Sequence, residues 1–382
     1  MAIDNPKILI VGGGVAGPAL ARFLKDFAEI TLVDKAPAWG NVGYTISLWG
    51  NGEKILNDLG LEHKILKRSY QLPWSSFDNK KGKLLSYFML DVFRSFGPTV
   101  IVSRTDLQQA LVKNLEEKVK IKMNATVAEI KNETESVAVT FSDGTKDVFD
   151  VVVGADGVHS KVRDLVFGTG FLKYYNWNFY VFWTPPNITP PNGVVQFEDG
   201  GKYCFICPYE NGATTMLAIA SKERMKKDKV ISKEFLHKNF SSFNPLVKDI
   251  IDSIEDISHV VKDDFMYVSM KDWHKGRVVL TGDAKHAHSP LLGMGTSMAL
   301  EDAYVLAEEL KKVDKKDIPL ALQKYANRRE RRVSRFHKQS TLLEKWVLIK
   351  SPFVSFFRDI ALRLVPSSYF TGHIQEILSE EI

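Results

Sequence analysis

Apolar and polar positions over the first 34 residues fall into blocks that predict a strand, a helix and a second strand. Residues 8–11 are continuously apolar, which is typical of a short strand buried on both faces of a sheet. Apolar residues then recur at helical spacing over 19–24, and residues 30–33 form a second apolar run. This arrangement predicts a β-α-β unit at the start of a parallel sheet.

The pattern changes character near residue 171. Before it, strands are predicted at 119–127, 137–141 and 148–153, following a helix for which Thr105 is the predicted N-cap. After it, aromatic and polar residues alternate between proline and glycine turns, which predicts an antiparallel sheet. We expect strands at 179–183, 194–197, 203–206 and 214–219, helices near 232–243 and 246–254, a buried strand at 277–280 and a helix over 298–310.

A glycine motif, Gly12-x-Gly14-x-x-Gly17, joins the first strand to the first helix. Gly12 permits a tight turn, Gly14 lets a pyrophosphate approach the backbone, and Gly17 lets the helix lie close to the strand. Asp34, at the end of the second strand, would accept hydrogen bonds from ribose hydroxyls. A carboxylate there disfavours a phosphate on the ribose, so the motif favours FAD or NAD over NADP. The alternative is an ordinary β-α-β unit that binds no ligand.

Length and charge narrow the class of protein. A chain of 382 residues is too long for one ordinary hydrophobic core, so we expect two or more domains. The net charge of +5 is small for this length, and the basic residues are scattered, so we expect no nucleic-acid partner. No run of 18 or more apolar residues occurs, so no membrane span is predicted.

The cysteines and a histidine pair are the remaining candidates for redox or metal chemistry. Cys204 and Cys207 lie in a strand-like run, where an odd spacing places them on opposite faces. We therefore expect buried structural thiols rather than a redox pair, and hence a reducing compartment, the cytoplasm. His286 and His288 are too few ligands for a metal site, so none is predicted.

The last part of the chain is predicted to be helical. The basic run over 324–338 indicates a solvated helix face, with a groove or membrane-surface role as the alternative. Residues 342–364 are apolar but interrupted at Pro352. We expect this segment to pack on the body of the protein and to cap a cavity.

Three separated stretches together resemble the class A flavoprotein monooxygenases, the para-hydroxybenzoate hydroxylase-like family. They match that family in order and relative placement over roughly residues 5 to 335. The stretches are Gly12-x-Gly14-x-x-Gly17 with Asp34; Gly154-Ala155-Asp156-Gly157 with Ser160 and Arg163; and Gly282-Asp283-Ala284 with His286, Pro290, Gly293 and Gly295.

The resemblance implies FAD, with its pyrophosphate on the first glycine loop and its ribose on Asp34. It implies that Asp283 contacts the ribityl or pyrophosphate region, that Arg104 contacts the FAD chain, and that the turn 290–295 lies beside the isoalloxazine ring. The full set of implied cofactor-binding residues is Gly12, Gly14, Val15, Ala16, Gly17, Asp34, Lys35, Arg104, Val127, Asp156, Asp283, Pro290, Gly293, Met294, Gly295 and Thr296.

The resemblance also implies the reaction. NADPH or NADH would reduce FAD and leave, and the reduced flavin would react with dioxygen to give a C4a-hydroperoxide that hydroxylates an aromatic or polycyclic enol substrate. Because the flavin carries this chemistry, we name no catalytic side chain. For substrate contact we select aromatic residues of the antiparallel sheet, with core packing as the alternative: Tyr180, Phe182 and Phe197.

Two departures from the family pattern stand out. After Gly-Asp-Ala this chain has Lys285 before His286, which would place a cation near the flavin. The common Gly-Gln-Gly-x-Asn is here Gly293-Met294-Gly295-Thr296-Ser297, so only backbone contacts of those two exchanged positions would be kept.

The implied fold is α/β: a Rossmann-like FAD-binding domain with an inserted antiparallel-sheet substrate domain and a C-terminal helical segment. The FAD-binding domain would take residues 1–70, 101–170 and 271–320, the substrate domain residues 71–100 and 171–270, and the C-terminal helices residues 321–382.

This layout also looks like that of the tetracycline destructases (tetracycline-inactivating monooxygenases), whose terminal helices close over a large cavity. A tetracycline antibiotic, inactivated as a means of resistance, is therefore the leading substrate prediction. The alternatives are a hydroxylase of another phenol or polyketide, an FAD-dependent reductase or saturase on the same fold, and a non-enzymatic flavin-binding scaffold that uses the basic helix as a contact surface.

Overall fold

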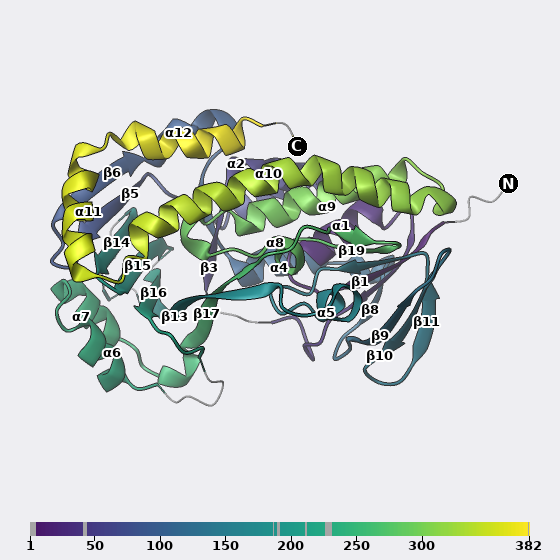
Figure 1. Cartoon of the computed structure of the whole chain (residues 1–382), viewed down its shortest axis with the longest axis horizontal. Helices are drawn as coiled ribbons and strands as arrows, with labels where there is room; N and C mark the ends of the chain where they lie inside the picture. Colours follow the sequence, from purple (N-terminus) through teal and green to yellow (C-terminus); the bar gives the residue numbers. More distant parts are fainter. Residues whose placement is uncertain are drawn as a thin grey trace.

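A computed structural model describes residues 5–40, 44–185, 187–188, 192–210, 212–225, 231–380 and 382. Strands of these residues form four sheets, and helices cover them (Figure 1). The three residues 41–43, part of the glycine-rich segment after Asp34, lie outside the described residues. The α/β fold class predicted from the sequence is confirmed.

The largely parallel sheet carries the first glycine motif. Its order is β18 (His274–Lys275), β19 (Val278–Leu280), β12 (Val151–Gly154), β1 (Lys7–Val11), β2 (Glu29–Val33) and β8 (Lys120–Lys122). All neighbours pair in parallel except β18 with β19. Helices α1 (Ala16–Leu24), α4 (Arg104–Val112) and α9 (Gly295–Lys311) share a hydrophobic core with one face of this sheet. The predicted β-α-β unit is therefore confirmed.

The second large sheet is built from two stretches far apart in sequence. Its order is β17 (Val261–Val268), β13 (Leu172–Thr184), β16 (Gly212–Ala220), β15 (Lys202–Tyr209), β14 (Val194–Asp199), β5 (Trp74–Asn79) and β6 (Leu84–Met89). It is antiparallel, as predicted, apart from the parallel pairing of β14 with β5. Helices α6 (Lys233–Phe240) and α7 (Pro245–Asp252) bury one face. The division of the chain into domains stays a prediction.

Two three-stranded sheets complete the strands described. One is β11 (Lys146–Phe149), β10 (Val137–Phe141) and β9 (Val127–Asn132), and it packs with α5 (Lys161–Phe167) on the other face of the parallel sheet. The other is β3 (Thr45–Leu48), β7 (Val100–Ser103) and β4 (Tyr70–Gln71).

Three local predictions were wrong. The strand predicted at 119–127 is limited to β8 (Lys120–Lys122), and Val127 begins β9 in another sheet. The single strand predicted at 148–153 is divided at Asp150 into β11 and β12, which belong to different sheets. The Asp150 carboxylate accepts a hydrogen bond from the Lys7 backbone N–H at 2.7 Å, which holds the chain at this bend. Thr105 is not the N-cap of α4: the Ser103 hydroxyl accepts from the Asp106 N–H instead, at 3.2 Å. Serine hydroxyls reach this N–H readily from the cap position.

The remaining helices lie mostly at the C-terminal end of the chain. After α9, the 30-residue α10 (Ile318–Val347) crosses the molecule, α11 (Pro352–Leu364) turns away, and α12 (Ser367–Leu378) returns beside α10 (Figure 1). Shorter helical segments are α2 (Gly50–Asp58), α3 (Glu62–Leu66), α8 (Asp283–His286), η1 (Leu90–Phe96), η2 (Leu115–Glu117), η3 (Ile257–His259), η4 (Pro290–Leu292) and η5 (Lys315–Asp317). No helix in the described ranges is long and apolar enough to cross a membrane.

The basic run over 324–338 is not a uniformly solvated face. Arg329 and Arg332 are buried, and both bind the buried carboxylate of Glu301, with Arg329 Nη1 2.6 Å and Arg332 Nε 2.7 Å from its Oε2. Arg329 Nε also donates to Asp302 Oδ1 at 2.6 Å. The prediction of a solvated face is wrong for these two residues, because their counter-charges lie on α9, far away in sequence.

The two cysteines follow the prediction. Cys204 and Cys207 lie on β15 as free, buried thiols, in different hydrophobic clusters on opposite faces of the sheet. Burial raises the pKa of both thiols, which keeps them protonated and unreactive.

Candidate cofactor and substrate site

The first and second glycine stretches are in backbone contact. Gly12 has a φ of +116°, and a Cβ added to it would lie 2.2 Å from the carbonyl oxygen of Ala155. A Cβ on Gly17 would lie 2.0 Å from the carbonyl oxygen of Gly12. Only glycine fits either position, as the motif predicts: Gly12 for the turn and Gly17 for the close approach of α1 to β1.

The third stretch joins the same place. A Cβ on Gly282 would lie 3.4 Å from the Cβ atoms of both Ala16 and Ala299, so this glycine sits between the starts of α1 and α9. Arg163 links the second stretch to the third, because its Nη1 donates to the carbonyl oxygen of Ala284 at 3.0 Å. The three stretches that were separated in sequence therefore meet at the carboxyl ends of β1, β12 and β19.

Two helices begin at this meeting point without a side-chain cap. Val15 precedes α1 and Met294 precedes α9, and neither side chain bonds the N–H groups of the first turn. A Cβ on Gly14 or Gly295 would meet nothing within 4 Å, so the backbone is open there. Uncapped N–H groups and the positive end of the helix dipole form a site for anionic groups.

Asp34 lies at the rim of the glycine loop. Its Oδ2 accepts from the Gly13 N–H at 2.6 Å and its Oδ1 from the Ala36 N–H at 2.8 Å. Lys35, next to it, is exposed. Gln108 on α4 donates to the Gly13 carbonyl oxygen at 2.5 Å, and its buried Oε1 has no partner among the described residues. An orphaned buried acceptor beside an open glycine backbone fits an extended nucleotide with donor groups, such as FAD.

Arg104 and Asp283 face one another across this region with Tyr44. The Arg104 guanidinium lies 5.7 Å from the centre of the Tyr44 ring. The Asp283 side chain reaches solvent at the open side of the site, while the protein on its other sides removes part of its hydration and raises the pKa of its carboxyl. The charges of His286 and Arg104 act in the opposite direction and lower that pKa in part. The arrangement places an anion and a cation along the predicted path of the cofactor.

The side chains of Asp156 and Val127 are engaged by other parts of the protein. The Asp156 carboxylate accepts from the Ser160 hydroxyl at 2.5 Å, from the Lys161 N–H at 2.7 Å and from the Val162 N–H at 3.1 Å, which fixes the start of α5. Burial raises the pKa of this carboxyl. Val127 is fully buried in the core beneath β9, so only its backbone can face a ligand.

The turn from Pro290 to Thr296 lies between β3, α2 and α9. Gly293 has a φ of +62°, and a Cβ there would lie 2.8 Å from the Ser47 hydroxyl. Trp49 fixes the turn from both sides: its Nε1 donates to the Gly293 carbonyl oxygen at 3.1 Å, and its backbone N–H donates to the Ser297 hydroxyl at 3.0 Å. Met294 is buried in the core, whereas Pro290 and Gly295 are exposed. The turn is thus rigid, with its backbone open at Gly295.

The prediction for Lys285, which precedes this turn in the sequence, needs correction. Lys285 turns toward the 270–273 loop, where its Nζ donates to the Met270 carbonyl oxygen at 2.8 Å and lies 4.6 Å from the centre of the Trp273 ring. Its expected approach to the cofactor is therefore wrong. Burial lowers the pKa of Lys285 to about 8.

The histidines of the same stretch are held by carboxylates. His286 Nε2 lies 2.6 Å from Asp302 Oδ2, and His288 Nδ1 lies 2.9 Å from Glu344 Oε1. Among the residues that the structure describes, no group of three or more His, Cys, Asp or Glu side chains is arranged to hold a metal ion.

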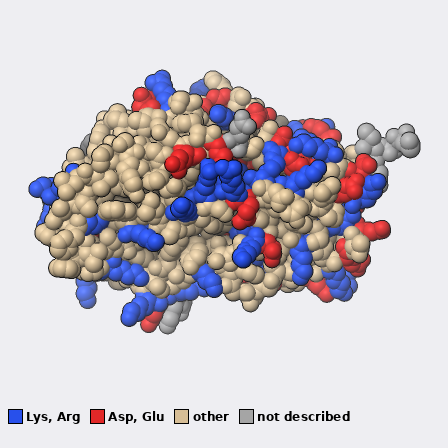
Figure 2. Space-filling model, turned by 45° about the horizontal axis from the view of Figure 1, so that its top comes forward, with Lys and Arg blue, Asp and Glu red and all other residues tan. Residues whose placement is uncertain are grey.

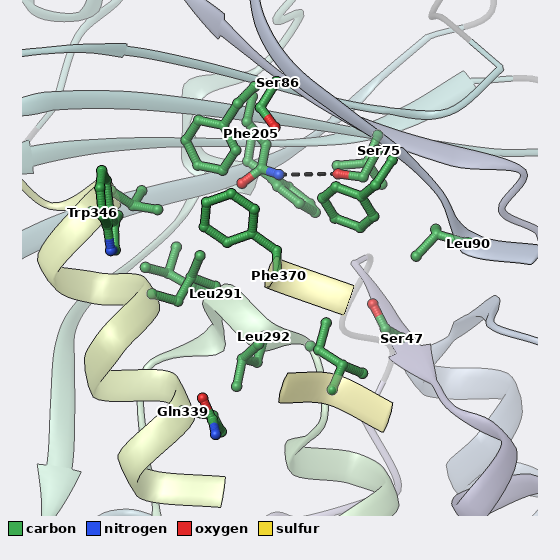
Figure 3. Close-up of a pocket in the computed structure, with 18 of the residues that line it drawn as sticks. Ser47, Ser75, Ser86, Leu90, Phe205, Leu291, Leu292, Gln339, Trp346 and Phe370 are labelled. Carbon is green, nitrogen blue, oxygen red and sulfur yellow. Dashed lines mark hydrogen bonds between the residues drawn. The ribbon is translucent and has the colours of Figure 1, made fainter. Parts of the chain in front are cut away.

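A cavity adjoins the turn, between the seven-stranded sheet and the C-terminal helices (Figure 3). Centres of water-sized molecules can occupy about 140 Å³ of it, roughly ten times the volume that one water requires on this measure. Its walls are largely apolar and come from β5, β6, β14, β15, the Pro290–Gly293 turn, α10, α11 and α12. Its wall residues include Ser75, Thr99, Gln196, Phe205, Leu291, Gln339, Leu362, Phe370, His373 and Ile374.

Two polar atoms in the cavity wall have no partner. The Thr99 hydroxyl and the His373 Nε2 are buried and make no hydrogen bond among the described residues. Gln339 Nε2 lies 3.3 Å from His373 Nδ1. When the Gln339 amide donates to Nδ1, the proton of a neutral His373 ring is on Nε2. In contrast, Gln196 Nε2 donates a hydrogen bond to the Ser75 hydroxyl at 3.1 Å (Figure 3). The wall of the cavity therefore includes a buried imidazole nitrogen and a buried hydroxyl that have no partner among the described residues.

The structure does not bring the three predicted substrate residues to this cavity. Tyr180, Phe182 and Phe197 lie in the core beneath α6 and α7, on the opposite face of the sheet. Gln196, next to Phe197 on β14, lines the cavity instead, together with its cross-strand partner Phe205 on β15. Because side chains alternate between faces along a strand, the error at Phe197 is one of parity. Tyr180 and Phe182 lie on β13, and the described cavity lining includes no residue of that strand. The residues of α10 and α12 that line the cavity carried no local signal in the sequence.

Comparisons with known proteins agree with this geometry. A family model described as FAD binding domain matches residues 5–340. A flavin-dependent monooxygenase from an unidentified prokaryote is 30% identical over 316 residues, 81% of each chain. The 2-heptyl-3-hydroxy-4(1H)-quinolone synthase of Pseudomonas aeruginosa strain UCBPP-PA14 is 28% identical over 365 residues, 94% of each chain. The crystal structure of the tetracycline destructase Tet(55) superposes with a TM-score of 0.79 at 26% identity, covering 98% of this chain and 97% of that one.

Proposed function

The chain belongs to the family defined by this FAD binding domain, which includes flavin-dependent monooxygenases, and from that premise we propose that it hydroxylates a planar enol or phenol with dioxygen and NADPH or NADH. The observation that carries the proposal is the meeting of three glycine stretches at two uncapped helix N-termini, directly beside an apolar cavity. When bound, FAD supplies the redox chemistry, including the activation of dioxygen.

The proposed FAD site uses groups that this chain leaves open. The start of α1, at Gly14, would hold the pyrophosphate, and Asp34 would hold the adenosine ribose. Arg104 and Asp283 would contact the part of FAD that connects its two ends. The open backbone of the Pro290–Thr296 turn would lie along the isoalloxazine ring. The N–H groups at the start of α9 stabilise negative charge there, because the helix dipole points its positive end to the same place.

The cavity performs two tasks for the reaction. Its apolar walls exclude water from the reacting atoms, which protects reactive species from hydrolysis. Its unsatisfied His373 N–H orients the substrate, because a buried donor without a partner costs roughly 1–3 kcal/mol that an acceptor oxygen of the substrate recovers. A ring compound with an enol, phenolate or carbonyl oxygen at its edge meets this requirement.

Two substrate classes satisfy the requirement. A tetracycline is the first candidate, supported by the similarity to Tet(55) over nearly the whole chain. A heterocyclic enol with a hydrocarbon chain is the second, supported by the largely apolar cavity and by the relative that, by its name, makes a hydroxyquinolone with a heptyl chain. The two differ in how much apolar surface the cavity must cover.

The test is oxidation of NADPH by the FAD-loaded protein in air, with a tetracycline, an alkylquinolone or no addition, followed by the mass of the product. A gain of one oxygen with either compound supports the proposal and selects the substrate class. Turnover that continues without dioxygen, with a product lacking added oxygen, would instead establish a reductase. A panel of phenols and polyketides in which no compound stimulates oxygen uptake would contradict the hydroxylase assignment.

Matched variants make the test specific. Gly12→Ala should lose bound flavin, because its Cβ would collide with the Ala155 carbonyl. Gly372→Ala on α12 is the control, since a Cβ there meets nothing within 4 Å. His373→Ala should raise KM about 5–20-fold and leave flavin content unchanged, as expected for the loss of one hydrogen bond to the substrate. An unchanged KM would rule out His373 as the anchor.

A further inference from the structure

Helix α11 turns its apolar side to solvent. Its apolar residues at positions 353, 356, 357, 360 and 364 recur at helical spacing and form one stripe. Four of them are more exposed than buried: Phe353 at 73%, Phe356 at 62%, Phe357 at 54% and Leu364 at 77%. The residues that face inward are Ser355, Arg358 and Leu362. A surface helix of a globular protein normally shows the reverse arrangement.

The exposed rings of α11 contact each other. The centres of the Phe353 and Phe357 rings are 5.0 Å apart, and those of Phe356 and Phe357 are 5.5 Å apart. The apolar surface continues onto β6, η1 and α12, which lie next to α11 or to each other. Its further exposed members are Leu84, Tyr87, Met89, Val92, Val354, Ile360 and Tyr369. We call this whole set the α11 face.

Cations surround the α11 face. Lys81 and Lys83 flank the turn into β6, Lys350 precedes α11, and Arg363 lies on α11 itself. All four are exposed, and none makes an ion pair with a described residue. In Figure 2 the broad tan area covers the end of the molecule that α11 and α12 form, and the charged atoms along its margin are mainly blue.

The acidic groups nearby are already engaged. Asp359 pairs with Arg358 at 2.6 Å, and Asp91 lies 3.6 Å from Arg94. A large apolar surface with unpaired cations at its edge has the chemistry of a helix that lies in the plane of an anionic membrane surface. Aromatic rings enter the boundary between headgroups and acyl chains, while Lys and Arg reach the phosphates.

We propose that the α11 face docks on the surface of a lipid bilayer that contains anionic lipids. A second copy of this chain fits the face less well, because a symmetric contact would bring the unpaired Lys350 and Arg363 of both copies together without counter-charges. No described helix is both long and apolar enough to span a bilayer, and the proposed contact lies in the membrane plane.

The helices that form the α11 face also form the outer wall of the cavity. Leu362 of α11 and Phe370 and Ile374 of α12 line the cavity, while Leu364 and Tyr369 of the same helices lie on the α11 face. Docking would therefore place the outer wall of the cavity against lipid, where apolar compounds concentrate. The docking itself does not depend on which reaction the cavity supports.

The experiment is cosedimentation of the FAD-loaded full chain with mixed vesicles of phosphatidylcholine and phosphatidylglycerol, and with phosphatidylcholine vesicles alone. We expect binding to the mixed vesicles that falls with added salt, because the cationic margin contributes. The triple variant Phe353→Ser, Phe356→Ser, Phe357→Ser should lower vesicle affinity at least about tenfold. The double variant Lys350→Glu, Arg363→Glu should lower it selectively for the anionic vesicles.

The matched control is a triple variant of exposed apolar residues elsewhere, Val148→Ser, Leu165→Ser, Leu320→Ser, which should bind vesicles like the parent. Flavin content and melting temperature verify that each variant is folded. The proposal is overturned if the parent stays in the supernatant with mixed vesicles, or if the phenylalanine variant binds as well as the parent. It is also overturned if the parent ignores vesicles while the phenylalanine variant turns a lipid-free dimer into a monomer, since the face would then join two copies.

Discussion

Two consecutive helices at the C-terminal end, α10 and α11, place charge and apolar surface in opposite ways. Helix α10 has many basic residues, yet its Arg329 and Arg332 are buried. Helix α11 is rich in phenylalanine and leucine, yet its apolar stripe is exposed. In α10 charge lies inside the protein, and in α11 the apolar side lies outside.

The difference shows that partners in the fold, rather than the composition of a helix, decide which side is buried. Glu301 and Asp302 on α9 supply the counter-charges for Arg329. On α11 the buried charged residue is again an arginine, Arg358, and its partner Glu198 comes from β14. Each helix therefore carries a buried ion pair on its inner side. On α10 apolar residues share that side, whereas on α11 most of them face solvent.

The largest effect should come from removing Arg329. Arg329→Ala would leave Glu301 and Asp302 buried without one of their counter-charges, and we expect a loss of about 3–5 kcal/mol in the free energy of unfolding. Urea titration followed by tryptophan fluorescence measures it. Arg331→Ala is the matched control, because that side chain is 74% exposed and should change stability by less than about 0.5 kcal/mol. Equal effects from the two variants would contradict the buried ion pairs of Arg329 with Glu301 and Asp302.

A smaller effect separates the two sides of α11. Leu362→Ala removes a side chain that is 4% exposed and should cost about 2–3 kcal/mol, less than in a fully packed core because it borders a cavity. Leu364→Ala, two residues away, removes an exposed side chain and should be nearly neutral. Chemical denaturation of the pair is the measurement. A cost for Leu364→Ala similar to that for Leu362→Ala would mean that another part of the chain covers the stripe.

The glycine stretches are the part of the site that the sequence could predict. The glycine stretches were predictable because a tight turn, an open backbone and a close helix each require glycine locally, as Gly12, Gly14 and Gly17 illustrate. The convergence of three such stretches was predictable because parallel strands end at one edge of a sheet. These arguments need only neighbours in sequence or a known sheet geometry.

The substrate cavity and the burial of α10 were not predictable in this way. His373 and Gln339 reach the cavity from two different helices, and nothing around either residue in the sequence distinguishes it. The choice between Phe197 and Gln196 depended on strand parity, which the position of α6 and α7 decides. Arg329 is one of several arginines in its run, and only the presence of Asp302 opposite marks it.

The two buried ion pairs should also respond to pH in opposite directions. Burial alone would raise the pKa of Asp302, but His286 and Arg329 outweigh it and hold that pKa well below its usual 3.8. The stability that this carboxylate contributes is therefore complete above about pH 4 and is lost as the pH falls further. At Glu198 burial outweighs Arg358 and raises the pKa from 4.5 to about 7. Its contribution is complete below pH 4.5 and is lost as the pH rises from 4.5 to 7.

Single isosteric variants isolate each contribution. Relative to Glu198→Gln, the parent should lose about 2–3 kcal/mol of unfolding free energy between about pH 5 and pH 7.5, since the variant does not titrate. Relative to Asp302→Asn, the parent should lose stability only below about pH 4. Urea titrations at several pH values measure both differences. If the Glu198 difference rose with pH instead, Arg358 would control the carboxylate as Arg329 controls Asp302, and the two helices would be held by equivalent pairs.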